Sequence, residues 1–224
     1  MPLSAESLTK NFFRESKGSN CFSAVEELSL RLEEGTVTVL TGRSGGGKTT
    51  VLNMMSGLLV PTKGRVLLDD TDIYSLTDKE LSKLRNDRFG VVPQGQTAIH
   101  SLNVIENILL PYAIYGEKTD DAVRSRADEL LQRLDIAQLS SAKPAELSGG
   151  ELRRMAIARA VIKKPGFIFA DEPTGDLDDE NTKTVFEFFR AAADEGAAVL
   201  IVTHEECAAE YADKVIKMAS GKIV

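Results

Sequence analysis

Short runs of apolar residues recur along the chain, and four of them have the length of a buried strand. They occupy residues 37–41, 89–92, 167–170 and 199–202. Because nearly every position in each run is apolar or β-branched, both faces of these strands are expected to be covered, as in a parallel sheet flanked by helices. Further β-like stretches lie in the first 35 residues or so and at residues 66–68. The pattern predicts a single α/β domain with a mostly parallel sheet.

Helical periodicity occupies much of the sequence between these runs. Residues 119–134 form an amphipathic pattern, which is most simply a packing face. Its apolar positions are Val123, Ala127, Leu130, Leu131 and Leu134. Residues 181–195 also have helical spacing. Asn103 and Glu106 form a capping box, which predicts a helix over residues 104–113.

A glycine-rich segment follows the first apolar run. Residues 42–49 read G-R-S-G-G-G-K-T and lead into a helix that is expected to stop near Gly57. Small residues let backbone N–H groups approach phosphate oxygens, and a helix N-terminus favours negative charge. Lys48 suits the β- and γ-phosphates, and the Thr49 hydroxyl suits Mg²⁺. The alternative, a glycine-rich turn beside a lysine, does not account for the complete motif between a strand and a helix.

Acidic residues and a histidine lie at the carboxyl ends of two other predicted strands. Asp171 and Glu172 follow residues 167–170, and His204 comes shortly after the last apolar run. Since that edge of a parallel sheet faces the ligand, Asp171 can hold Mg²⁺ and Glu172 can accept a proton from water. The alternatives are a strand cap for the acids and a structural role for a lone histidine. The upstream phosphate loop favours catalysis, whereas His100 has no such context.

The sequence L-S-G-G-E at residues 147–151 has two compatible interpretations. Ser148 and Glu151 form a capping box, so a helix starts here whatever the function. A helix N-terminus that includes Gly149 and Gly150 is also an anion site. The segment has no evident use in the site of its own chain, so we expect a second copy of the chain to use it.

In this order, the motifs resemble those of the ATP-binding cassette (ABC) proteins, specifically the nucleotide-binding subunit of an ABC transporter. The resemblance covers essentially the whole chain. Residues 42–49 match the Walker A motif, residues 147–151 the signature motif, and residues 167–171 Walker B, with Glu172 as the catalytic glutamate. Three shorter matches complete the set: Gln94 in the Q-loop, Leu177 and Asp178 in the D-loop, and His204 as the switch histidine.

This resemblance implies a P-loop NTPase core with an N-terminal antiparallel β subdomain and an inserted α-helical subdomain. The core would comprise residues 1–95 and 157–224, and the helical subdomain residues 96–156. It also implies a head-to-tail homodimer that binds and hydrolyses ATP with Mg²⁺ and drives a separate membrane permease. The implied catalytic residues are Lys48, Gln94, Glu172 and His204, and the implied Mg²⁺ ligands are Thr49, Gln94 and Asp171. The implied nucleotide contacts are Phe12, Gly42, Arg43, Ser44, Gly45, Gly46, Gly47, Lys48, Thr49, Thr50, Ser148, Gly149, Gly150 and Asp178.

Two of the implied contacts have open alternatives. Phe12 falls where the family stacks an aromatic ring on adenine, and Phe13 is the neighbouring candidate for that role. The alternative for Phe12 is a position in the hydrophobic core without a role in binding. Residues 95–102 are expected to line the groove that receives a short helix of the permease, with Ile99 and Leu102 among the contacts. The alternative for this segment is an ordinary connecting loop whose apolar residues pack internally.

Residues 173–178, P-T-G-D-L-D, resemble the P-T-G-N-L-D stretch of the lipoprotein-releasing, macrolide-exporting and cell-division ATPases. An exporter or a lipoprotein- or peptide-extracting system is therefore expected, and the alternative is a cell-division type of ATPase that signals across the membrane without transport. The chain departs from this pattern at Asp176 (usually Asn), Arg153 (usually Gln), Gly95 (commonly aromatic) and His100 (frequently Pro). ATP hydrolysis is still expected despite these departures, but they leave open which membrane permease is the partner.

Composition narrows the choice of partner and location. A net charge of −7 without a basic run argues against nucleic acid as the main partner. Cys21 and Cys207 form no disulfide or metal pattern, which fits a reducing cytosol. No apolar run approaches the roughly 18–20 residues of a membrane helix, and no export signal is evident. The expected location is cytoplasmic, peripheral on the inner face of the membrane through the permease.

Two other classes of protein agree less well with the sequence. A soluble ABC protein acting on DNA or ribosomes usually carries two cassettes, a coiled-coil insertion or zinc cysteines, and none of these is evident here. A simple P-loop kinase would not need the Ser-Gly-Gly turn at residues 148–150.

Overall fold

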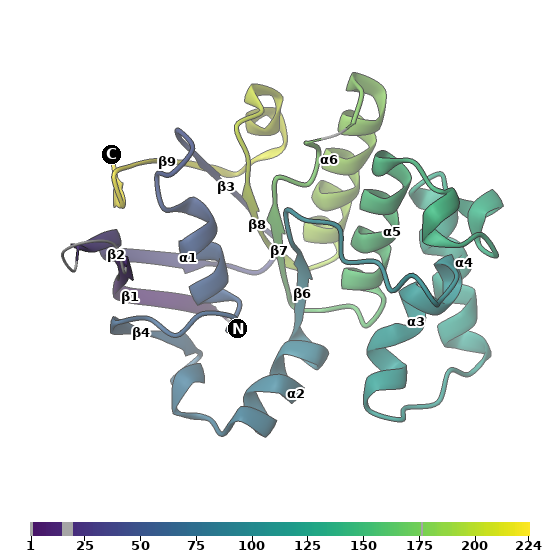
Figure 1. Ribbon diagram of the computed structural model, residues 1–224, viewed down its shortest axis with the longest axis horizontal. Helices are drawn as coiled ribbons and strands as arrows, with labels where there is room; N and C mark the ends of the chain where they lie inside the picture. The colour runs from purple at the N-terminus through teal and green to yellow at the C-terminus, as the bar shows by residue number, and fades with distance from the viewer. Residues whose placement is uncertain (1, 15–19, 176) are drawn as a thin grey trace.

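The computed structural model describes residues 2–14, 20–175 and 177–224, so the departure at Asp176 lies outside the described residues. Two sheets lie on either side of α1 (Lys48–Met55), and α3 to α6 lie beyond the larger sheet (Figure 1). The phosphate loop is at the start of α1, between β3 (Val37–Thr41) and this helix.

The smaller sheet is antiparallel and belongs to the N-terminal third of the chain. Its strand order is β2-β1-β4-β5, formed by β1 (Leu3–Arg14), β2 (Asn20–Leu32), β4 (Lys63–Leu68) and β5 (Thr71–Asp72). Strand β1 pairs with both β2 and β4 and so lies inside the sheet. The expected β-rich, antiparallel N-terminal part is confirmed.

The larger sheet contains all four of the predicted buried strands. Its order is β10-β9-β3-β8-β7-β6, formed by β3 (Val37–Thr41), β6 (Phe89–Val92), β7 (Phe167–Asp171), β8 (Ala198–Val202), β9 (Lys214–Ala219) and β10 (Lys222–Ile223). All neighbours except β9 and β10 pair in parallel. The carboxyl ends of β3, β6, β7 and β8 therefore meet at one edge.

Alternate side chains of the larger sheet enter two different hydrophobic cores. Val39 and Ile168 pack in the core covered by α3 to α6, whereas Leu40 and Phe169 pack in the core shared with α1 and the smaller sheet. Because both faces are covered, the strands are consecutively apolar, as the sequence pattern predicts. Helix α1 is held between the two sheets, which fixes the phosphate loop at its N-terminus.

The remaining helices agree with the predicted pattern except for two of their starts and for the helix at residues 78–88, which the sequence pattern does not predict. They are α2 (Asp78–Arg88), α3 (Val104–Ile114), α4 (Asp121–Arg133), α5 (Gly149–Val161) and α6 (Asp179–Asp194), with short 3-10 helices η1 (Ile73–Ser75), η2 (Ala137–Leu139), η3 (Pro144–Glu146) and η4 (Glu206–Tyr211). The capping boxes of Asn103 and Ser148 are both present. Helix α4 starts two residues later than expected and α6 two earlier, because Asp120 and Asp178 are the caps.

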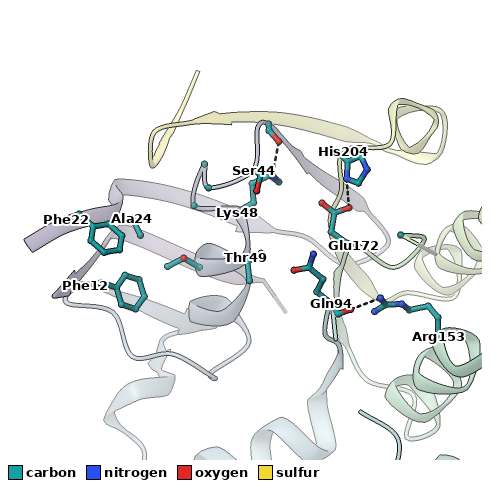
Figure 2. Close-up of a pocket in the computed structure, with 16 residues that line it drawn as sticks. Phe12, Phe22, Ala24, Ser44, Lys48, Thr49, Gln94, Arg153, Glu172 and His204 are labelled. Carbon is teal, nitrogen blue, oxygen red and sulfur yellow. Dashed lines mark hydrogen bonds and ion pairs between the residues drawn. The ribbon is translucent and has the colours of Figure 1, made fainter. Parts of the chain in front are cut away.

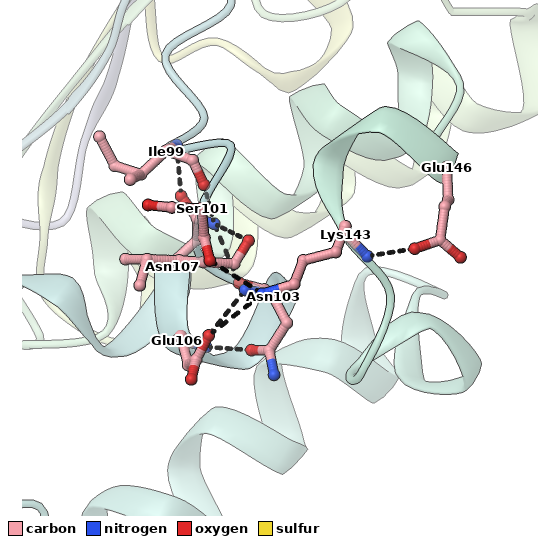
Figure 3. A network of polar contacts seen from close by, with 8 residues as sticks. Ile99, Ser101, Asn103, Glu106, Asn107, Lys143 and Glu146 are labelled. Atoms are coloured by element: carbon pink, nitrogen blue, oxygen red, sulfur yellow. Dashed lines mark hydrogen bonds and ion pairs between the residues drawn. The ribbon is translucent and has the colours of Figure 1, made fainter.

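Asn107 fixes the segment that precedes α3. It is fully buried, and its Oδ1 accepts a hydrogen bond from the N–H of Ile99 at 2.8 Å (Figure 3). Its Nδ2 donates to the carbonyl oxygens of Ile99, Leu102 and Asn103, at 3.1, 3.2 and 2.9 Å. The loop before α3 is therefore tied to that helix from Ile99 onward.

Candidate functional site

The phosphate loop joins the end of β3 to the start of α1. Gly47 has a φ of 95°, and a Cβ there would lie 2.3 Å from the carbonyl oxygen of Ala24, so only glycine fits. Lys48 is 7% exposed. Its ammonium donates to the carbonyl oxygens of Gly42 and Arg43 at 2.8 and 3.2 Å. The loop thus holds the ammonium on its inner side, where phosphate oxygens are expected.

Strand β7 brings a buried carboxylate to the loop. Asp171 is 3% exposed and accepts a hydrogen bond from the Thr49 hydroxyl at 3.2 Å. Burial raises the pKa of Asp171, while the hydrogen bond from Thr49 and the cations of Lys48 and Arg153 act in the opposite direction. Two of the three residues predicted to hold Mg²⁺ are therefore in direct contact.

Glu172 and His204 form a pair at the ends of β7 and β8. Oε2 of Glu172 lies 3.0 Å from Nδ1 of His204, whose side chain is 68% exposed. Glu172 has a φ of +46°, a left-handed conformation that costs about 1–3 kcal/mol in a residue with a side chain. Its N–H donates to the carbonyl oxygen of Val202 at 2.8 Å, so β8 supports this conformation.

One cavity of about 790 Å³ collects these groups (Figure 2). The predicted residues that line it are Phe12, Gly42, Ser44, Gly45, Gly46, Gly47, Lys48, Thr49, Thr50, Gln94, Glu172 and His204. The side chain of Gln94 points toward the space between Thr49 and Glu172. Further lining residues, to which the sequence assigns no role, are Phe22, Ala24, Arg153 and Gly175.

Six predicted residues do not line this cavity: Arg43, Asp171, Ser148, Gly149, Gly150 and Asp178. Asp171 contacts the cavity residue Thr49, and Arg43 contributes its carbonyl oxygen to the phosphate loop. Ser148 is exposed at the start of α5, where its Oγ accepts a hydrogen bond from the N–H of Glu151 at 3.3 Å. Asp178 caps α6 by accepting from the N–H of Asn181 at 2.8 Å. The signature turn and the D-loop therefore lie outside their own chain's cavity.

Two aromatic rings form the end of the cavity farthest from Glu172 (Figure 2). Phe12 on β1 is paired in register with Phe22 on β2, and their stacked rings have centroids 5.8 Å apart. Phe13 is 75% exposed and does not line the cavity. The structure thus places Phe12, and not Phe13, in the wall of the cavity. Alternation along β2 puts Phe22 and Ala24 on one face, but that this face meets Phe12 depends on the register with β1.

The ABC transporter family model matches residues 25–175, which is more than half of the chain. The chain belongs to the ABC transporter family. It is 38% identical over 203 residues to the lipoprotein-releasing system ATP-binding protein LolD of Aquifex aeolicus, a match covering 91% of this chain and 90% of that protein. It is 36% identical over 208 residues to the macrolide export ATP-binding/permease protein MacB of Mannheimia succiniciproducens, covering 93% of this chain and 32% of that protein.

Solved structures of ABC cassettes are also similar to this one. A dimeric structure of a bacterial ABC transporter cassette matches with a TM-score of 0.91 and 32% identity, covering 99% of this chain and 96% of that chain. A dimeric post-hydrolysis state of a cassette bound to ADP and Pi matches with a TM-score of 0.90 and 32% identity, with the same coverage. These matches confirm the predicted ABC ATPase fold and ATP as the nucleotide, and the chain is an ATPase of this family.

Among the described residues, every helix is too short or too polar to cross a membrane.

Substitution of Phe12 by alanine is expected to weaken ATP binding by roughly 5- to 30-fold, because loss of aromatic stacking on a base costs about 1–2 kcal/mol. Phe13→Ala is the matched control and should leave the Kd unchanged, since Phe13 is outside the cavity. Calorimetric titration with ATP measures both. A larger loss for Phe13→Ala than for Phe12→Ala would show that the base lies elsewhere.

Proposed function

We propose that this chain is the ATP-hydrolysing subunit of an exporter or lipoprotein-extracting ABC transporter, and that two copies close head-to-tail around MgATP. The observation that carries the proposal is the division of the site. The phosphate loop and the Glu172–His204 pair share one cavity, while the signature turn at residues 147–151 lies outside it. A complete site therefore needs a second copy. The dimeric form of the similar cassettes supports this arrangement.

The donors at the loop fit Mg²⁺. The Thr49 hydroxyl and the Asp171 carboxylate are in contact, and the amide of Gln94 points toward the same edge. Mg²⁺ takes oxygen ligands and is commonly held by one or two protein groups together with substrate phosphates. When bound, it would neutralise charge on the β- and γ-phosphates. Burial raises the pKa of Asp171, so a bound cation would favour the ionised carboxylate that such a site requires.

Different residues of the chain have different roles in hydrolysis. Lys48 and the backbone N–H groups of residues 44–49 bind the phosphates and stabilise the negative charge that develops on them. Glu172 takes a proton from the attacking water. His204 contacts Glu172 and fixes where its carboxylate lies. Phe12 orients the adenine, and Ser148, Gly149 and Gly150 bind the phosphates held by the other copy.

We assign the core to residues 1–95 and 157–224 and the helical subdomain to residues 96–156. Helix α5 runs without interruption across the second boundary, from Gly149 to Val161. The two parts are therefore joined by one loop after β6 and by one continuous helix. Asp178, which caps α6 next to this helix, is proposed to act across the dimer rather than within its own cavity.

We place the protein on the inner face of the cell membrane, held there by a permease. The names of its relatives, a lipoprotein-releasing system protein and a macrolide export protein, support transport over the alternative of signalling without transport.

An apolar groove between α2 and α3 is the best candidate surface for that permease. Its volume is about 390 Å³, and its apolar lining comprises Leu58, Phe89, Val91, Leu110, Pro111, Ile114, Tyr115, Ala160 and Pro165. Leu58 and Ile114 are 53% and 64% exposed, which is high for large apolar side chains. Arg85, Arg159 and Lys163 also line it, but Lys163 is already paired with Asp87 and Glu117, so a mostly apolar helix would fit. Ile99 and Leu102 do not line this groove, so the permease contacts predicted for them stay a separate prediction.

Leu58→Asp and Ile114→Asp are expected to weaken permease binding and permease-stimulated ATPase by roughly tenfold or more, because each places a charge against an apolar contact. Basal ATPase and melting temperature of the isolated subunit should stay unchanged. Val215→Asp, at a residue that is 50% exposed outside the groove, is the matched control. Normal stimulation of both groove variants would exclude this surface and, with it, the proposed route of coupling.

A further inference from the structure

Arg153 is a buried cation that the functions assigned so far do not explain. It lies on α5 and is 8% exposed. A buried guanidinium must be paired to offset its loss of hydration. Its Nη1 donates to the carbonyl oxygen of Pro93 at 2.6 Å. Its Nη2 donates to the carbonyl oxygen of Gln94, also at 2.6 Å (Figure 2). These are short, charge-assisted hydrogen bonds.

The loop that receives these bonds has little other packing at its centre. A Cβ added to Gly95 would meet no atom within 4 Å, and Gln94 and Gln96 are exposed. Arg159, also on α5, donates to the carbonyl oxygen of Thr97 at 2.7 Å. The helix therefore holds the loop at two places, and Arg153 holds the one that carries Gln94.

The guanidinium is suited to this contact in a way that glutamine or lysine is not. Its planar fork presents two parallel N–H groups, one for each of two successive carbonyl oxygens. A lysine ammonium offers a point charge without the fork, and a glutamine amide is neutral and shorter. Arg153 also lines the nucleotide cavity together with Thr49 and Gln94, so the residue lies beside the edge where Mg²⁺ is proposed to bind.

We infer that Arg153 is a positioning residue: by fixing the main chain at Pro93 and Gln94, it aims the Gln94 amide at the Thr49–Asp171 edge. The inference rests on the proposed function, because it acts through the role proposed there for Gln94. It also makes α5 responsible for two parts of the reaction. The N-terminus of the helix serves the other copy's nucleotide, and Arg153 serves the nucleotide of its own chain.

The test is a double-mutant cycle on steady-state ATP hydrolysis with Gln94→Ala, Arg153→Gln and the double variant. Arg153→Gln should lower kcat by roughly tenfold with little change in KM for ATP. In the Gln94→Ala background, the same substitution should lower kcat by less than about twofold, because the group it positions is gone. Arg153→Lys, which keeps the charge and loses the fork, should fall between the wild type and Arg153→Gln.

Melting temperatures of all variants separate positioning from folding. Arg126→Gln, which removes another mostly buried arginine outside the nucleotide cavity, is the control and should leave kcat unchanged. If Gln94→Ala itself has no effect, the proposed role of Gln94 fails. If Gln94→Ala lowers kcat but Arg153→Gln does not, or lowers it equally in both backgrounds, the positioning inference alone is overturned. If Arg153→Gln unfolds, the same comparison is made with Arg153→Lys.

Discussion

Replacement of Glu172 by glutamine is expected to lower ATP hydrolysis by about 10²–10⁴-fold while ATP binding is retained. The amide keeps the size of the side chain but cannot accept the proton of the attacking water. Such a loss corresponds to roughly 3–5 kcal/mol of activation barrier. Phosphate release measures the hydrolysis, and titration with a fluorescent ATP analogue measures the binding.

Glu206→Gln is the matched control for this substitution. It makes the same chemical change two residues after His204, on the exposed side of η4, and should leave the rate unchanged. Hydrolysis by the Glu172→Gln variant at near the wild-type rate would show that another group is the base.

Ser148→Arg is expected to abolish the ATP-dependent dimer that Glu172→Gln otherwise accumulates. The arginine would occupy the start of α5, where the phosphates held by the other copy must dock. It would also remove a helix cap worth about 1 kcal/mol, so Ser148→Asp serves as a second variant. Aspartate preserves the cap and opposes the phosphates by charge, so it should prevent the dimer without loss of melting temperature. Analytical ultracentrifugation with ATP distinguishes monomer from dimer.

Asn103→Arg provides the positional control for the dimer experiment. It disrupts an equivalent capping box, at the start of α3, and introduces the same charge away from the signature turn. The dimer should persist in this variant. A Ser148→Arg protein that dimerises normally, or a wild-type protein that hydrolyses ATP as a strict monomer at high dilution, would contradict the shared site.

The strands and helix caps could be predicted because their signals are local. Buried parallel strands require consecutive apolar residues, and residues 37–41 and 89–92 coincide with β3 and β6. Capping boxes depend on side chains three residues apart, so Asn103 and Ser148 mark their helix starts correctly. The phosphate loop is a local motif as well, although it is Ala24, on the separate strand β2, that leaves no room for a side chain at Gly47.

What the sequence did not predict depends on contacts between distant segments. Phe22 reaches the cavity only because β2 pairs with β1, and the sequence pattern does not specify the register of that pairing. Helix α2 was not predicted from the sequence, because Leu81 is its only buried residue. Arg153 is noticeable in the sequence as a departure, but its contact with Gln94 spans 59 residues and becomes visible only in the fold.

The continuity of α5 has a mechanical consequence. Its 13 residues extend about 20 Å, from the turn offered to the other copy to the wall of the apolar groove, to which α5 contributes Arg159 and Ala160. A continuous helix of this length moves as one body, so a displacement of one end also displaces the other. Closure of the dimer would therefore displace the groove wall relative to whatever occupies the groove. In the other direction, a displacement imposed at the groove by the membrane partner would be transmitted along α5 to the signature turn.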